Sequence, residues 1–266
     1  MNQNERRRYL IDALLAEREE CRVIPLPTTE EGQKRLLRTL FNVRPPLPAD
    51  KEFLRVQDEY LKEEIRAAGI TDFCDLTPIE EGIYLWQGDI TRLRCDAIVN
   101  AANSALLGCF YPNHGCIDNA IHTFAGVELR LACAALMKKQ GREEKTGGAK
   151  ITPAFNLPSR YVIHTVGPIV RGRLGEKERR QLAACYASCL ALAEAHSVGS
   201  IAFPCISTGE FRFPGEEAAK IAVQTVRDVI PEQKCKVKVI FDVWKDEDLT
   251  LYRRFLGRYE SAENRA

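Results

Sequence analysis

Three side chains that can bind a metal lie within eight consecutive residues of this chain. Cys109, His114 and Cys116 occur in the stretch "GCFYPNHGCID", which ends at Asp118, two residues after Cys116. A loop of that length can bring all three side chains to one ion, and Zn²⁺ accepts thiolate and imidazole at roughly 2.0–2.3 Å, with a fourth position open for water or substrate. The spacing is not that of a common zinc finger. The pattern alone therefore leaves two interpretations open: a metal site, or a loop with two free thiols and a solvated histidine.

The remaining histidines and most of the other cysteines suit structural roles. His122, His164 and His196 lie in patterns typical of helices or strands, so none is an obvious fourth ligand. The chain has ten cysteines but no signal-peptide pattern, so we interpret most as reduced, buried small hydrophobes rather than disulfides. The clearest examples are in apolar helical patterns: Cys133, Cys185 and Cys189.

A second candidate binding segment is "CISTGEFRFPGEEAA", residues 205–219, which joins an apolar strand pattern to a helical one. Backbone N–H groups of such a small-residue turn can hold a pyrophosphate, and the following helix N-terminus favours negative charge. Phe211 could stack on a ribose or a base. An ordinary glycine turn is the alternative. Neither a Walker loop nor a dinucleotide-binding glycine motif occurs.

Two polar residues end strand-like runs. Asp89 in "QGDI" could accept an amino proton from a purine, or it could cap the segment that follows. Asn103 ends "DAIVNAAN", where its amide could hold a sugar hydroxyl or serve as a turn residue.

Strand and helix patterns alternate from about residue 80 onward. Strands are expected at 83–90, 96–103, 160–168, 200–208 and 236–244, and helices at 118–140, 176–196, 215–230 and 246–259. This order predicts an α/β fold with a mixed, largely parallel sheet covered on both faces. Ligands of such sheets bind beyond the carboxyl ends of the strands, which is where the unusual segments fall.

Residues 1–75 differ from the rest of the chain in their residue pattern. Apolar residues recur at helical spacing among dense charges in 6–19, 29–43 and 51–69, and proline-rich joints separate these stretches. We expect a helical N-terminal extension over residues 1–75 that packs on a main domain formed by residues 76–266.

Composition excludes several classes of function. The net charge of +1 provides no field for binding nucleic acid, and no apolar run approaches the roughly 20 residues of a membrane span. The N-terminus carries charge without the apolar core of a signal peptide, so we expect a cytoplasmic protein. We also expect a monomer that binds neither nucleic acid nor membrane.

Six segments, taken in order, resemble the signature of the macrodomain family of ADP-ribose-binding modules. They are "QGDI", "DAIVNAAN", "LLG", "CIDNAIHTFAG", "YVIHTVGP" and "ISTGEFRFP", spread over roughly residues 80–245. The inserted "CFYPNHGC" departs from most macrodomains and resembles the zinc-dependent subclass, which also carries an N-terminal helical extension. The resemblance implies a three-layer α/β/α macrodomain and one Zn²⁺ per chain held by Cys109, His114 and Cys116.

The resemblance also implies an activity. That subclass removes ADP-ribose from proteins and is associated with sirtuin-type ADP-ribosyltransferases, so we expect hydrolysis of mono-ADP-ribose esters on protein carboxylates. Asn103 and Asp118 are the expected catalytic residues, and His122 is expected to be structural support rather than a catalyst. The implied substrate-binding residues are Asp89, Ile90, Asn103, Cys116, Ile117, Asp118, Ser207, Thr208, Gly209, Glu210 and Phe211. Two alternatives are a non-catalytic ADP-ribose-binding module and a zinc-stabilised interaction scaffold.

Overall fold

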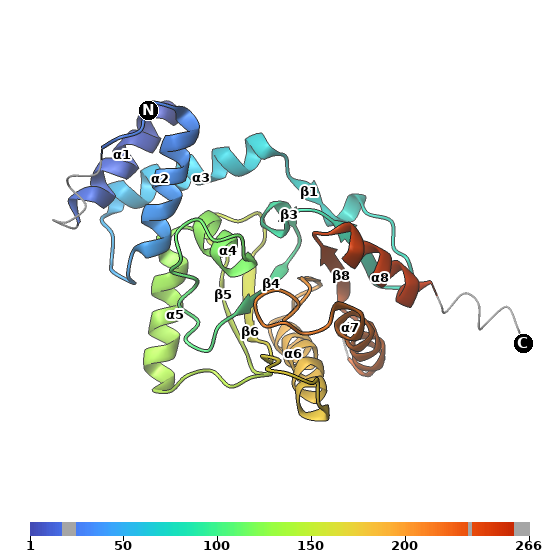
Figure 1. Ribbon diagram of the computed structural model, residues 1–266. Helices are drawn as coiled ribbons and strands as arrows, with labels where there is room; N and C mark the ends of the chain where they lie inside the picture. Colours follow the sequence, from blue (N-terminus) through green and yellow to red (C-terminus); the bar gives the residue numbers. More distant parts are fainter. Residues whose placement is uncertain (18–24, 234–235, 258–266) are drawn as a thin grey trace, which may run out of the picture.

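A computed structural model describes residues 1–17, 25–233 and 236–257, and its centre is a six-stranded sheet (Figure 1). The strands lie in the order β2-β8-β7-β4-β6-β5, and only β5 runs antiparallel to its neighbour. Their bounds are β2 Ile83–Gln87, β4 Ala97–Ala102, β5 Ala149–Pro153, β6 Tyr161–Val166, β7 Ser200–Phe203 and β8 Lys238–Val243. The mixed, largely parallel sheet is therefore confirmed. A short parallel pair, β1 Thr71–Asp72 and β3 Leu93–Arg94, lies outside it.

Helices cover both faces of the sheet because its strands alternate their side chains between two cores. In β4, Ala97 and Val99 enter one core, together with residues of α6 (Glu176–Ala195), α7 (Gly215–Val229) and α8 (Asp246–Leu256). Ile98 and Ala102 enter the opposite core with residues of α4 (Ile117–Ala125) and α5 (Val127–Gln140). This alternation at period two yields the expected three layers.

Among the described residues, three helices precede the sheet: α1 (Gln3–Ala16), α2 (Glu30–Val43) and α3 (Lys51–Ala68). Each begins at a capping side chain, from Asn2, Thr29 and Asp50 respectively, that accepts a backbone N–H of its first turn. Their apolar faces form a core of their own, which Val127 at the start of α5 completes. Figure 1 shows α1 and α2 at one end of the molecule, with α3 running from them towards β1.

The prediction of a single helix at 118–140 is wrong, because two helices occupy that stretch. Gly126 separates α4 from α5 with a φ of +94°, a backbone conformation that residues with a Cβ rarely adopt, and the two helices are bent by 110°. The strand β5 was not expected from the sequence. The last residues of the helical patterns at 6–19 and 246–259 lie outside the described residues.

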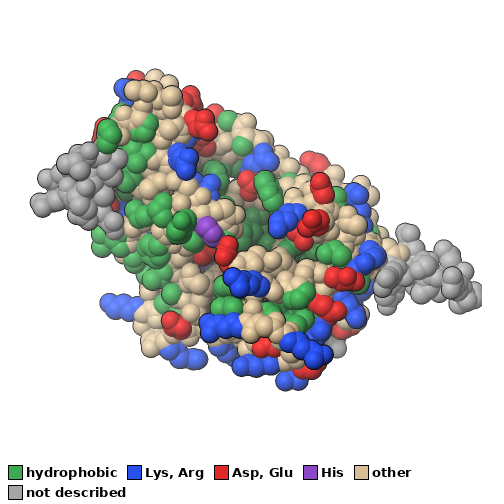
Figure 2. Space-filling model, viewed as in Figure 1, with side chains coloured by type: hydrophobic (Ala, Val, Ile, Leu, Met, Phe, Trp, Pro, Cys, Tyr) green, Lys and Arg blue, Asp and Glu red, His purple; other side chains and the backbone are tan. Residues whose placement is uncertain are grey.

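The described part of the chain contains no single helix long and apolar enough to cross a membrane, and only the bent pair α4 and α5 meets that criterion when its members are combined. On the face drawn in Figure 2, acidic and basic side chains are interspersed rather than gathered in a patch of one sign. Cys133, Cys185 and Cys189 are free and buried, as expected.

Candidate active site

The segments singled out in the sequence follow strands whose carboxyl ends meet at one edge of the sheet. Asp89 lies just after β2, the loop 103–116 follows β4, and the loop 204–213 follows β7. Because β2, β7 and β4 are parallel, all three segments emerge on the same side. This edge is where open α/β sheets bind ligands.

The three donor side chains converge. The ligand atoms of Cys109, His114 and Cys116 all lie within 4.8 Å of one another, and each residue is half-buried. The Cys109 Sγ and His114 Nδ1 atoms are 3.7 Å apart. Tetrahedral zinc bonds of the usual lengths would place sulfur and nitrogen ligands roughly 3.5 Å apart. The donor set and its spacing therefore fit a divalent cation such as Zn²⁺ with three protein ligands.

Burial affects the protonation of one of these thiols. It raises the pKa of the Cys116 thiol to about 12, so this thiol keeps its proton at neutral pH when no cation is near. Binding of a metal by such thiols releases protons and becomes weaker as the pH falls. Cys116 is also the N-cap of α4, where its Sγ accepts the N–H of Asn119 at 3.5 Å.

The first turn of α4 contributes the candidate phosphate-binding positions Ile117 and Asp118. Asp118 is 5% exposed, and its Oδ1 accepts a hydrogen bond of 2.8 Å from Nδ2 of Asn100 on β4. Burial raises the pKa of Asp118 to about 6. Asn100 is a functional candidate that we did not single out from the sequence. A polar residue in the otherwise apolar run "AIVNAA" was the available signal.

His122 lies one turn beyond Asp118, and its Nε2 is 3.5 Å from the Asp118 Oδ1. Its ring is buried, and burial holds its pKa well below the usual value, so it is neutral. A Cβ on Gly108 would lie 2.8 Å from the ring, so only glycine lets the loop pass this closely. These contacts suit the structural role expected for His122.

A second group of potential ligands, His122, Cys133 and His164, also lies within 4.8 Å and is buried. His164 already has polar partners at both ring nitrogens: Asn100 Nδ2 is 3.2 Å from Nδ1, and Thr152 Oγ1 is 3.0 Å from Nε2. His164 is therefore a hydrogen-bonded part of the core, whereas the two ring nitrogens of His122 are buried without a hydrogen-bond partner among the described residues.

Asn103 makes the contacts of a turn residue, and Asp89 makes those of a capping residue, as the structural alternative for each predicted. Asn103 donates to the carbonyl of Gly108 at 3.1 Å and accepts the N–H of Ala105 at 3.1 Å, which shapes the start of the loop. Asp89 caps a 3₁₀ turn (η3, Ile90–Arg92) by accepting the Thr91 N–H at 3.0 Å. The Ile90 side chain is packed in the core. A role for these residues in ligand binding remains a prediction.

The second loop places Ser207 in a left-handed conformation, with a φ of +67° and its Oγ buried without a partner. The Thr208 hydroxyl donates to the Cys205 carbonyl at 3.0 Å, and the Gly209 carbonyl accepts from the N–H of Arg212. Glu210 connects this loop to the donor cluster, because its Oε1 lies 3.6 Å from His114 Nε2. Phe211 is half-buried at the loop's end.

Comparisons with known proteins identify the family of this chain. Residues 99–222 match the family described as Macro domain. A protein-ADP-ribose hydrolase of Treponema medium is 54% identical over 97% of this chain and 100% of its own length. A protein of the same name from Staphylococcus aureus (strain MSSA476) is 51% identical over 94% of each chain.

Solved structures also match. A Trypanosoma brucei macrodomain in complex with ADP-ribose superposes with a TM-score of 0.63 at 28% identity, over 82% of this chain and 94% of that chain. The family match, the near-full-length relatives and the shared fold lead to one assignment: this chain belongs to the Macro domain family.

Proposed function

We propose that this protein is a zinc-dependent hydrolase that removes mono-ADP-ribose from modified protein side chains. The observation that carries the proposal is the convergence of Cys109, His114 and Cys116 at the ligand-binding edge, next to Asp118. The names of the relatives at 54% and 51% identity support the reaction. Both are named protein-ADP-ribose hydrolase, and both match nearly the whole chain.

In this proposal ADP-ribose lies along the carboxyl edge of the sheet. Asp89 accepts a hydrogen bond from the adenine amino group, with Ile90 beside it. The pyrophosphate lies between the N-terminus of α4 (Cys116, Ile117 and Asp118) and the loop Ser207–Phe211, where backbone N–H groups favour anions. Phe211 then covers the distal ribose, near Asn103.

The residues around the scissile bond have distinct proposed tasks. Asn103 fixes the distal ribose through its side-chain amide. Asp118 orients or deprotonates the attacking water at its carboxylate, which the hydrogen bond from Asn100 holds in a defined orientation. One Zn²⁺ on Cys109, His114 and Cys116 would supply Lewis-acid polarisation or a bound water of lowered pKa. The ester formed by the distal ribose and a protein carboxylate is the proposed bond, and a sirtuin-type ADP-ribosyltransferase is the proposed source of the modification.

His114→Ala tests whether the metal serves catalysis. This variant removes one donor and leaves Cys116 at the N-cap of α4 untouched. We expect loss of zinc and a fall of orders of magnitude in the release of ADP-ribose from a carboxylate-modified protein, because transition-state stabilisation is lost. Affinity for free ADP-ribose, held mainly by Asp89 and the two phosphate loops, should change much less.

The matched control is His196→Ala, which removes an exposed histidine at the C-terminus of α6 and should change none of these quantities. Near-ultraviolet circular dichroism establishes that each variant is folded. A zinc-free His114→Ala protein that releases ADP-ribose at the parent rate would refute a catalytic metal. If affinity for free ADP-ribose fell as steeply as the rate of ADP-ribose release, the metal would instead have a structural role in holding the loop.

A further inference from the structure

The loop that carries the three donor side chains is fastened to α2 in the N-terminal helices. Arg38 on α2 donates from Nη2 to the backbone carbonyl of His114 at 3.1 Å. The same guanidinium donates to Oδ1 of Asn119 on α4, at 2.8 Å from Nη2 and 3.2 Å from Nε. One side chain of the extension therefore binds both a donor residue and the helix that follows the loop.

Asn119 is the centre of this network and is fully buried. Its backbone N–H points at the Sγ of Cys116, and its Nδ2 donates to the carbonyl of Tyr111 at 3.0 Å. A weaker contact of 3.5 Å joins the same Nδ2 to the carbonyl of Cys109. Because Arg38 occupies the amide oxygen, it fixes which way the amide points, and the NH₂ group is thereby turned towards the loop.

Two further residues of α2 bind the tip of the loop. Asn42, one turn after Arg38, accepts the backbone N–H of Asn113 at 2.9 Å and donates to Thr123 of α4 at 2.9 Å. Thr39 accepts from the side-chain amide of Asn113 at 2.6 Å. Asn113 has a φ of +53°, a conformation that asparagine tolerates better than most residues, and it directly precedes His114.

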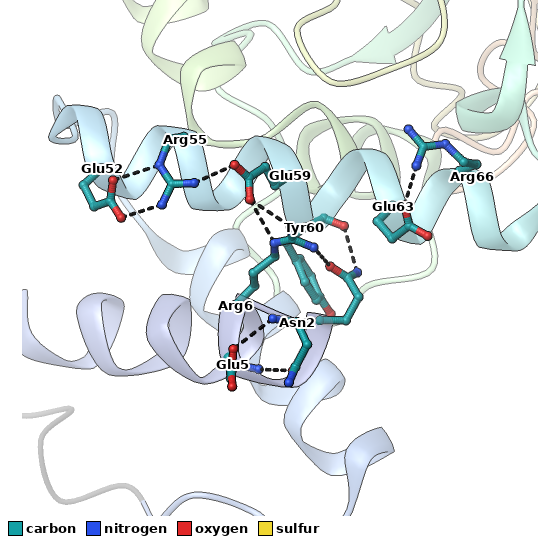
Figure 3. A network of polar contacts seen from close by, with 10 residues as sticks. Asn2, Glu5, Arg6, Glu52, Arg55, Glu59, Tyr60, Glu63 and Arg66 are labelled. Carbon is teal, nitrogen blue, oxygen red and sulfur yellow. Dashed lines mark hydrogen bonds and ion pairs between the residues drawn. The ribbon is translucent and has the colours of Figure 1, made fainter.

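The three helices of the N-terminal extension, which present these side chains, are held together by their own contacts. Their apolar core is shared with Val127 of α5. Arg6 of α1 reaches Glu59 of α3 at 2.8 Å, and Figure 3 shows this pair beside the capping contacts of Asn2 and Glu5. Arg66, in contrast, pairs with Glu63 on its own helix (Figure 3). The α2 side chains therefore project from a packed support.

From these contacts we propose that Arg38, Thr39 and Asn42 are positioning residues for the metal donors, so that the N-terminal helices form part of the active site. The inference rests on the proposed function, because it presupposes that Cys109, His114 and Cys116 hold a cation. Outer partners that orient metal ligands typically contribute 10–100-fold to metal affinity. The contacts act on the backbone of the loop and on the side chains of Asn113 and Asn119, so they set the spacing of the donors without touching the metal.

The test is the affinity of the full-length chain for Co²⁺ and Zn²⁺, measured by competition with a chromophoric chelator. Cobalt also gives a thiolate charge-transfer band that reports the geometry at Cys109 and Cys116. The variants are Arg38→Met, which removes the donors but keeps the length of the side chain, and Thr39→Val, which removes one hydroxyl at nearly constant shape. The matched control is Arg66→Met.

We expect Arg38→Met to weaken metal affinity 10–100-fold and to alter the cobalt band, and Thr39→Val to weaken it several-fold. Arg38→Lys should recover part of the affinity, because its ammonium can reach one of the two acceptors. Arg66→Met should match the parent in both measurements.

Three outcomes separate the inference from the proposed function. A parent protein that binds no metal through its two loop cysteines overturns both. A parent that binds metal while the Arg38 and Thr39 variants bind equally well overturns only the inference. If Arg38→Met does not fold, Thr39→Val decides alone, and parent-like affinity in that variant overturns the inference.

Discussion

Replacing Arg130 with methionine should cost about 3 kcal/mol of the free energy of unfolding. Arg130 lies on α5 and is 5% exposed. Its guanidinium donates to three carbonyls, those of Leu107 at 2.7 Å, Phe41 at 3.0 Å, and Arg44. It therefore joins the end of α2 to the loop that follows β4.

The magnitude follows from two opposing terms. Each hydrogen bond from a charged group contributes roughly 1.5–3 kcal/mol, and the substitution leaves three carbonyls without this donor. The pKa of Arg130 is lowered to about 10, chiefly by burial, and a net shift of this size corresponds to roughly 3 kcal/mol against the charged form, which methionine does not incur. The hydrogen bonds outweigh this cost by about 3 kcal/mol, and for a domain of this size such a change lowers Tm by roughly 6–12 °C.

Urea unfolding followed by circular dichroism measures the effect. The control is Arg55→Met, because Arg55 is exposed and pairs with Glu52 and Glu59 on its own helix (Figure 3). Exposed pairs of this kind contribute little to stability. An Arg130→Met protein as stable as the Arg55 variant would refute the idea that this buried cation joins α2 to the sheet domain.

Three other predictions concern the site and its surroundings. Asp89→Ala should weaken ADP-ribose binding by at least ~1.5 kcal/mol, the scale of a lost hydrogen bond to a charged group, and unchanged affinity in calorimetry would remove Asp89 from the adenine pocket. Parent protein should contain one zinc per chain by elemental analysis, and metal that persists after joint Cys109→Ala and Cys116→Ala substitution would place it elsewhere. Burial lowers the pKa of His164 from 6.5 to about 4, so between these values the unfolded chain binds a proton that the folded chain does not. The contribution of His164 should therefore lower stability by up to roughly 3 kcal/mol as the pH drops through this window, and His164→Asn should show a shallower slope of unfolding free energy against pH, with the dependence due to buried His122 left in place; a slope equal to that of the parent would contradict it.

The sequence predicted those parts of the fold that depend on local pattern. The helix expected at 176–196 is observed as α6, Glu176–Ala195, because its apolar residues recur at helical spacing over five turns. The break at Gly126 was not predicted, since the apolar pattern continues across it and only the backbone conformation interrupts it. The strand β5 was missed because its residues, "AKITP", are mostly only partly buried and form no apolar run.

At the site, residue types and spacing predicted the cluster of metal donors. The contacts from α2 that hold the loop of the donors could not be predicted. The convergence of Cys109, His114 and Cys116 within 4.8 Å agrees with what a short loop allows. The contact between Arg38 and Asn119 joins residues 81 positions apart. Asn119 lies in the signature segment "CIDNAIHTFAG", but Arg38 belongs to no recognisable motif, and the pairing follows only from the packing of α2 against α4. Long-range polar contacts of this kind leave no periodic signal in one sequence.

The most direct test of the central claim is mass spectrometry of a protein ADP-ribosylated on carboxylates, before and after incubation with this chain. The claim predicts that the mass of the modified protein falls by that of one ADP-ribose group and that free ADP-ribose appears, with no loss when the zinc has been removed by a chelator. A modified protein that keeps its full mass, while this chain binds free ADP-ribose in the same buffer, would contradict the claim and identify a binding module instead.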